Sequence, residues 1–284
     1  MTAPARTAGV ARRHRYAATP LSVFETAWRR RGLVFELARR DVASRYRGSF
    51  LGVLWALLSP FLTLAVFTFV FTTIFESRWG VAVGSRWDFA LLLFAGLIVF
   101  WFFADCVNRA PGLMFENASY VKRVVFPLEI LPWVAVLNGL FHAALSAIVL
   151  GVASVVAKGA LPWTAVATPL LFLPLVLWVL GLSWLLASMG VFLRDLKQIV
   201  PVVVTLLLFL SPIFYPLSAV PDWFRAYIEL NPMAWVIEQV RGGLFFGRLP
   251  SWQSFAIAMV SGWLVAWLGL VWFQKTRKGF ADVV

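Results

Sequence analysis

Residues 89–104 read FALLLFAGLIVFWFFA, a run without a single charged side chain. A helix that crosses the hydrocarbon core of a bilayer needs about 20 mostly apolar residues. Because polar side chains such as Asp105 and Asn108 are tolerated at the membrane interface, we expect the helix to continue to Arg109. The run therefore predicts a membrane-spanning helix over 89–109.

The rest of the chain has the same character. Of its 284 residues, 61% are hydrophobic and 13% are charged, whereas soluble domains average about 25% charged residues. Five further apolar stretches are long enough to span, so the sequence predicts an all-α integral membrane protein with a six-span domain over 48–274. The predicted spans are 50–75, 89–109, 128–157, 164–193, 198–216 and 252–274.

The positions of the basic residues predict the orientation. Nineteen of the 25 Lys and Arg side chains fall in 1–48, 109–127, 194–197 and 275–284, and six fall in the alternate loops. Because basic residues accumulate in cytoplasmic loops, both termini and the tail 275–284 are predicted to be cytoplasmic. The basic N-terminal run does not indicate nucleic-acid binding, since an anionic membrane surface explains a basic run directly before a span.

The segment 1–47 is predicted to be cytoplasmic and to carry an amphipathic helix. Over 20–47 the helical period places Val34, Phe35, Ala38 and Val42 on one face. A helix of this kind is typical of the membrane interface.

A proline-rich break follows the fifth predicted span. Residues 211–216 read SPIFYP, and two prolines four residues apart are incompatible with a straight helix. Beyond the break, 221–228 and 232–241 each open with proline and predict two short amphipathic helices at the outer interface. In the second of these, Glu238 and Arg241 are three residues apart and are expected to pair on one face of the helix.

Few ionisable side chains lie within the spans. Asp105 and Arg109 are four residues apart, which predicts an anchoring pair across one helical turn. His142 is the one side chain titrating near neutral pH that lies well inside a span. It allows two interpretations, packing against a neighbour or a proton relay. The otherwise uncharged span centres disfavour proton-coupled transport.

The sequence lacks the motifs of a catalytic or metal site. It contains no G-x-x-x-x-G-K-[ST] phosphate loop, no H-E-x-x-H and no G-x-S-x-G, and its single cysteine cannot form a paired metal site. We therefore predict no catalytic residue, no metal site and no cofactor in this chain. ATP and Mg²⁺, if they are used, bind a partner subunit.

Aromatic residues are abundant, with 26 Phe, 15 Trp and 5 Tyr. Many of these rings occupy positions typical of the interfacial belts of membrane proteins. Rings deeper in the spans allow two interpretations, packing against lipid or lining a pathway along which a sugar chain can slide. The candidate channel-lining residues are Phe61, Phe67, Phe71, Phe209, Phe214 and Tyr215.

These features occur together with a set of ordered motifs, and the chain from about 35 to 284 resembles the ABC-2-type permeases that export polysaccharides. The order of these motifs along a six-span layout is specific. The motifs are RDVASRYRGSFLGVLW at 40–55, SP at 59–60, FTFVF at 67–71, VKRVVFPLEILP at 121–132, RDL at 194–196, SPIFYP at 211–216, NPM at 231–233 and FADVV at 280–284.

The resemblance implies a homodimer in the bacterial inner membrane, joined to two copies of a separate ATPase subunit and exporting a lipid-linked glycan such as O antigen, capsule or teichoic acid. It also implies that 20–47 and 110–124 contact the ATPase, with Glu116, Asn117 and Tyr120 as candidate coupling residues. Gate helices are implied over 221–246, and the candidate outer-gate residues are Trp223, Tyr227, Trp235, Glu238 and Arg241.

Basic residues at the inner entrance are candidates for binding the phosphate of the lipid. They are Arg45, Arg47, Lys122 and Arg123, and the guanidinium fork of arginine matches phosphate oxygens. Their alternative role is to fix the orientation of the chain in the membrane.

Three other functions remain open. The first is an ABC-2-type efflux permease for small hydrophobic compounds. The second is a membrane transferase acting on lipid-linked sugars, which would need carboxylates or a histidine poised at an interface loop. The third is a structural membrane protein, which would not explain two proline-opened helices at one face.

Overall fold

The computed structural model describes residues 19–74, 86–122 and 126–284. All regular secondary structure in these residues is helical. Five helical segments are long and apolar enough to cross a membrane: Gly52–Phe69, Trp87–Glu116, Leu128–Lys158, Trp163–Phe192 and Trp252–Gly279. Their principal helices are α3 (Trp55–Phe69), α4 (Arg86–Arg109), α7 (Leu131–Lys158), α8 (Thr168–Phe192) and α12 (Trp252–Thr276).

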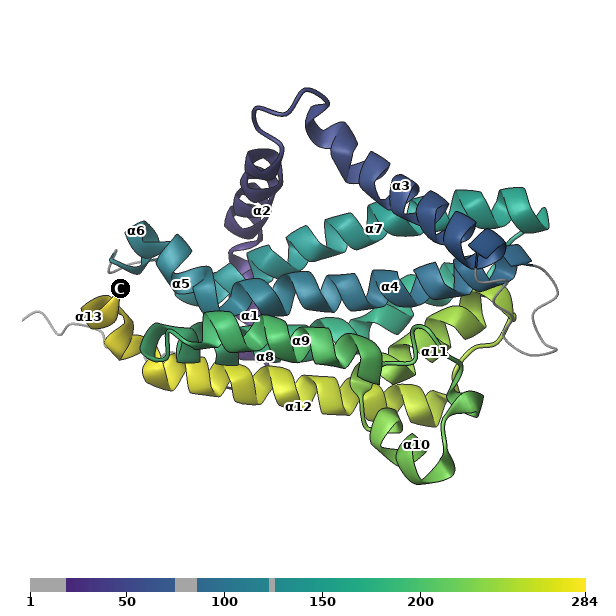
Figure 1. Cartoon of the computed structure of the whole chain (residues 1–284). Helices are drawn as coiled ribbons and strands as arrows, with labels where there is room; N and C mark the ends of the chain where they lie inside the picture. Colours follow the sequence, from purple (N-terminus) through teal and green to yellow (C-terminus); the bar gives the residue numbers. More distant parts are fainter. Residues whose placement is uncertain (1–18, 75–85, 123–125) are drawn as a thin grey trace, which may run out of the picture.

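The long helices lie side by side along one axis, with α3 leaning outward from the bundle (Figure 1). We name the two ends of the bundle by short helices. The α5 end carries α5 (Leu113–Glu116), α6 (Ala118–Val121) and α13 (Phe280–Val283), and the α10 end carries α10 (Asp222–Glu229).

Helix α4 occupies the centre of the bundle. Almost every side chain from Phe89 to Phe103 is buried, because helices pack around α4 and its sequence is apolar on all sides. Helix α8 packs against α4 and, on another side, against α12, and Gly181 of α8 faces Gly269 of α12 at their contact. Small residues at such a contact let two backbones approach within a membrane.

The fifth apolar segment differs in length from the prediction. Helix α9 spans Leu196–Leu210, and its 15 residues correspond to about 22 Å at 1.5 Å per residue. This is shorter than the hydrocarbon core of about 30 Å. The helix stops before Ser211 because the prolines at 212 and 216 interrupt it. Thus five helices meet the length criterion in the described part of the chain, and a sixth crossing stays a prediction.

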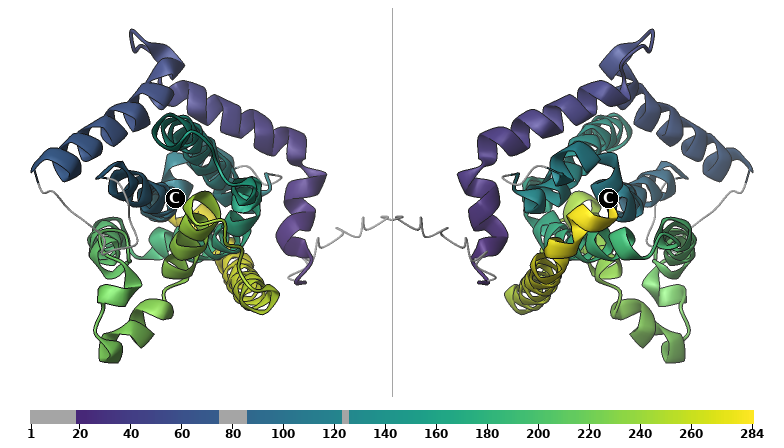
Figure 2. Two further views of the ribbon diagram at one scale, coloured as in Figure 1. Left: turned by 90° about the vertical axis from the view of Figure 1, so that its right-hand side faces the viewer. Right: turned by 90° about the vertical axis from the view of Figure 1, so that its left-hand side faces the viewer.

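The N-terminal segment forms two helices, α1 (Ser22–Arg29) and α2 (Arg31–Arg45), where one helix was predicted. Figure 2 shows them wrapping one side of the bundle. Val34 and Ala38 of α2 pack against the start of α7. Phe35, predicted on the same face, is 69% exposed because successive residues differ by about 100° around a helix.

The two short helices predicted after the proline break are present as α10 and α11 (Pro232–Phe245). Their environments differ. Helix α10 projects from the bundle (Figures 1 and 2), whereas α11 packs against α4 and α8. Met233, Val236 and Ile237 are buried, so α11 is part of the bundle rather than a surface helix as predicted.

Candidate functional site

Two ion pairs join α2 to α4 at the α5 end. Nη1 of Arg109 lies 3.0 Å from Asp41, and Nη2 of Arg45 lies 3.2 Å from Asp105. The predicted pairing of Asp105 with Arg109 is therefore wrong. Both α4 residues face α2, where Asp41 and Arg45 have the same four-residue spacing and the same order of charge, and the acid of each helix pairs with the base of the other.

Asp41 is also tied to α7. The side-chain amide of Asn138 donates a hydrogen bond to its carboxylate. Burial raises the pKa of Asp41, but the hydrogen bond and charge of Arg109, helped by Asn138 and by the charge of Arg45, outweigh it and hold the pKa below 3.8. The carboxylate is thus ionised at neutral pH and fixes α2 against α4 and α7.

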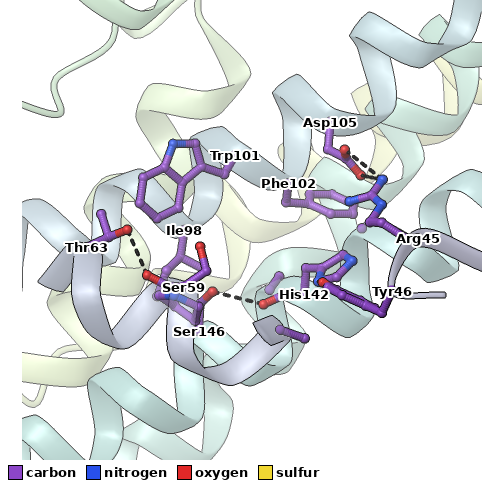
Figure 3. Close-up of a pocket in the computed structure, with 14 residues that line it drawn as sticks. Arg45, Tyr46, Ser59, Thr63, Ile98, Trp101, Phe102, Asp105, His142 and Ser146 are labelled. Carbon is purple, nitrogen blue, oxygen red and sulfur yellow. Dashed lines mark hydrogen bonds and ion pairs between the residues drawn. The ribbon is translucent and has the colours of Figure 1, made fainter. Parts of the chain in front are cut away.

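A cavity of about 300 Å³ lies beside the Arg45–Asp105 pair, between α3, α4 and α7 (Figure 3). It combines charged and hydroxyl groups with aromatic rings, which is the composition of a site that orients a polar ligand. The side chains that define it are Arg45, Tyr46, Ser59, Thr63, Trp101, Phe102, Asp105, His142 and Ser146.

His142 extends from α7 to this cavity, where its ring lies beside Tyr46 (Figure 3). The Tyr46 hydroxyl is 3.4 Å from Nδ1 of the histidine. The other ring nitrogen, Nε2, is buried and has no hydrogen-bond partner among the described residues. His142 therefore retains one hydrogen-bonding position that the protein leaves unused.

The predicted phosphate-binding residues do not form one group. Arg45 lines the cavity, whereas Arg47, in the turn after α2, and Lys122, at the end of α6, are exposed away from it. Arg123 lies outside the described residues. The structure thus associates one of the four predicted residues with the cavity.

The predicted channel rings fall into two groups on different helices. On α3, Phe61 is 56% exposed, whereas Phe67 and the following Phe71 are 6.0 Å apart and pack against the core. On α9, Phe209 is 64% exposed and lies 6.1 Å from Phe214. The Tyr215 hydroxyl donates to the carbonyl of Phe209 and closes the end of that helix.

The predicted gate residues occupy two different environments. Trp223 and Tyr227 are exposed on α10, and Trp235 of α11 packs against Phe255 of α12 at 6.4 Å. Glu238 is partly exposed, and its carboxylate lies 3.4 Å from Arg241. The predicted pairing of Glu238 with Arg241 is confirmed, and the side chain of Arg241 is only 2% exposed.

Arg241 connects three segments of the chain. Its Nε donates to the carbonyl of Leu92 in α4 at 2.9 Å. Its Nη1 and Nη2 donate to the carbonyls of Pro212 and Ile213, directly after the end of α9. Carbonyls beyond a helix end lack helical partners, so this guanidinium satisfies groups that the proline break leaves free. An arginine among the apolar residues of 232–245 was the available signal for this role.

The predicted coupling residues lie at the tip of the α5 end. Glu116 is exposed, the Asn117 side chain donates to the carbonyl of Leu113 at 2.9 Å, and Tyr120 stacks on Phe126 at 4.5 Å. The preceding turn is packed tightly on α8, because a Cβ added to Gly190 would overlap the carbonyl of Pro111. The tip is therefore in direct contact with α8.

Comparison with known proteins gives consistent matches over most of the chain. Residues 32–245 match the model of the family described as ABC-2 type transporter. An O-antigen export system permease protein, RfbA, from Myxococcus xanthus is 31% identical over 265 residues, covering 89% of this chain and 96% of that protein. The RfbA protein of Klebsiella pneumoniae is 24% identical over 253 residues, 89% of this chain and 95% of its own. The polysialic acid transport protein KpsM of Escherichia coli is 22% identical over 240 residues, covering 84% and 91%.

Proposed function

Because the chain belongs to the ABC-2 type transporter family, we propose that it is the membrane-spanning permease subunit of an ATP-driven exporter of a lipid-linked polysaccharide. The proposal is carried by one observation. The chain aligns over nearly the full length of relatives that are named for O-antigen export and polysialic acid transport. The names of these relatives favour a polysaccharide over a small hydrophobic compound. They are also transport permeases rather than transferases.

The proposed topology has six crossings, with α9 as the fifth. Its short length is compensated by the segment around Ile213, which is buried beside α4 through Arg241. The α5 end then faces the cytoplasm of a bacterial cell with an inner membrane, and both termini lie there. The excess of basic residues at this end supports that orientation.

The proposed partner is a separate ATPase subunit, with two copies binding a homodimer of this chain. The sequence carries no phosphate-binding loop, so the energy source must be supplied by another protein. The tip formed by α5 and α6 is exposed at Glu116 and rests on α8, which suits it to receive a push when the ATPase closes. Helix α2 provides a second contact for the ATPase.

The proposed pathway runs between two copies of the chain. Helices α3 and α9 both expose large apolar side chains, including Phe61 and Phe209. In a homodimer such faces can line a passage whose flat rings contact a glycan without holding it by strong hydrogen bonds. The lipid of the substrate stays in the bilayer, and its phosphate meets the basic residues at the α5 end, among them Arg45 and Arg47.

The test is co-purification of this chain with the product of a neighbouring ATPase gene, followed by ATP turnover with and without lipid-linked glycan. We expect a stable two-plus-two complex whose turnover changes when the glycan is added. The proposal would be contradicted if the chain purified without an ATPase. It would also be contradicted if the ATP turnover of the complex did not change when the glycan was added.

We also predict that replacing both Arg45 and Arg47 with glutamine abolishes export while leaving assembly with the ATPase normal. The two guanidinium groups offer charge-assisted donors to a lipid phosphate, and glutamine removes the charge while keeping a similar polar length. Export is measured by the appearance of the glycan outside the inner membrane. The control is Arg39→Gln on the exposed face of α2. Unchanged export in the double variant would show that Arg45 and Arg47 do not bind the lipid phosphate.

A further inference from the structure

Four charged side chains at the α5 end can form ion pairs in two different ways. We call them the four-charge cluster: Asp41 and Arg45 of α2, and Asp105 and Arg109 of α4. In the structure each acid pairs with the base of the other helix, at 3.0 Å and 3.2 Å. Within each helix the acid also lies four residues before the base, which is the favourable order for an ion pair across one helical turn. Each charge therefore has a second partner of opposite sign in its own helix.

The alternative partners are close, and there is room for the exchange. Burial raises the pKa of Asp41, Arg109 and Asn138 lower it, and the charge of Arg45 lowers it further, so the two α2 residues already interact. The Arg45–Asp105 pair borders the polar cavity of about 300 Å³. The Arg109–Asp41 pair borders a second cavity, of about 360 Å³, between α2, α7 and the tip formed by α5 and α6. The four side chains are 24–37% exposed, so rotamer changes can exchange the pairs without displacing the core.

The two halves of α2 are held in different ways. Val34 and Ala38, in its first half, pack against the start of α7 in an apolar cluster that contains no described residue of α4. The second half, 41–45, is held to α4 by the two ion pairs and to α7 by the hydrogen bond from Asn138. Beyond it the chain turns at Gly48, whose φ of 83° suits glycine. Helix α2 can thus pivot about its packed first half once the ion pairs to α4 separate.

We propose that α2 is a latch with two states, and that closure of the ATPase subunits shifts it from the closed to the open state. In the closed state, which the structure shows, the four charges pair between α2 and α4. In the open state α2 has pivoted away from α4, and each acid pairs with the base four residues later in its own helix. Both states contain two ion pairs, so opening leaves no charge without a partner. The hydrogen bond from Asn138 to Asp41 favours the closed state in the isolated chain.

Opening the latch changes access to the polar cavity. Arg45 and Tyr46 form the wall of this cavity at the end of α2, and its other lining residues belong to α3, α4 and α7. A pivot of α2 therefore opens the cavity on one side. The part played by the ATPase rests on the function proposed above, in which α2 is one of the two contacts for that subunit. The latch adds a defined structural change between this contact and the membrane-spanning helices.

The test measures the position of α2 by pulsed electron paramagnetic resonance between two spin labels on the full chain in detergent. The labels are attached at Ala43→Cys on α2 and Lys275→Cys on α12, which are exposed, whereas the native Cys106 is buried and stays unlabelled. The α2 reversal combines Asp41→Arg with Arg45→Asp. It places like charges opposite each other across α2 and α4 but keeps an acid and a base four residues apart in α2. We expect the ratio of closed to open molecules to fall about tenfold or more.

The matching α4 reversal combines Asp105→Arg with Arg109→Asp. Alone, it is expected to displace α2 as the α2 reversal does, because it creates the same like-charge contacts. The two reversals together restore opposite charges in both pairs between the helices, so the quadruple variant is expected to return to the distance of the unmodified chain. The control reverses an exposed acid and an exposed base of α2 outside the cluster, Glu36→Arg with Arg39→Glu, and should leave the distance unchanged.

The latch is overturned if either reversal alone keeps the distance of the unmodified chain, or if the quadruple variant does not restore it. A single reversal that does not fold also overturns it, because the open state requires each helix to be stable with its own ion pair. None of these measurements on the chain alone involves the ATPase.

The role of the ATPase is tested with the same two labels in the complex. Adding ATP is expected to move the unmodified chain to the distance found in the single reversals. If ATP leaves the distance unchanged in a complex whose turnover responds to the glycan, the ATPase does not drive the latch. If no complex with an ATPase forms, the proposed function fails, whereas the latch itself is judged on the distances in the chain alone.

Discussion

Replacing Arg241 with methionine is expected to lower the free energy of unfolding by about 3 kcal/mol or more, because the buried carbonyls of Pro212 and Ile213 lose their donor and the contact with the carbonyl of Leu92 in α4 is lost as well. Methionine keeps much of the length of the side chain but offers no N–H group. A single unsatisfied buried group costs about 1–3 kcal/mol, and the two costs are not additive because the groups share one site. For a chain of this size, the loss corresponds to a fall in melting temperature of roughly 6–12 °C.

The measurement is thermal unfolding of the purified chain in detergent. Arg248→Met is the matched control, because Arg248 lies just beyond α11 and is exposed. The melting temperature of Arg241→Lys should lie between those of the two methionine variants. One ammonium group cannot reproduce the fixed fork of a guanidinium toward carbonyls on separate segments. If Arg241→Met melts at the same temperature as the Arg248→Met control, the guanidinium does not hold the end of α9 as we describe.

The elements that could be predicted are those set by local composition. The uniformly apolar run at 89–104 becomes the central helix α4, since every face of it can be buried. The proline-opened segments after residue 220 become α10 and α11, because proline at a first helical turn and the break before it are local effects.

The features that could not be predicted depend on which helices become neighbours. The spacing of Asp105 and Arg109 suits a pair within α4. It suits equally well contacts with Asp41 and Arg45, which lie sixty or more residues earlier in the chain. Sequence spacing describes one helix and carries no information about the helix facing it. Arg241 shows the same limit, because its partners become available only where α9 ends beside α4 and α11.

Replacing Gly269 with leucine is expected to prevent α12 from packing on α8, with a loss of about 3 kcal/mol or more or no accumulation of folded chain. A Cβ at Gly269 would overlap the carbonyl oxygen of Gly181, and one at Gly181 would overlap the carbonyl of Val265. Both obstacles are backbone atoms, which cannot rotate away as a side chain can. Gly32→Leu on α2 is the control, because no atom lies within 4 Å of the added Cβ there.

The consequence of this substitution should extend beyond stability. Helix α12 leads to Arg277, which pairs with Glu129 at 2.6 Å and donates to the carbonyl of Phe126 at 2.7 Å. These contacts hold the start of α7 close to the predicted ATPase contact, so a displaced α12 would disturb that surface as well. The smaller variant Gly269→Ala, which adds the Cβ alone, should therefore lower both the melting temperature and the yield of complex with the ATPase. Retention of normal melting and normal complex formation by Gly269→Ala would show that the close approach of the two helices is not required.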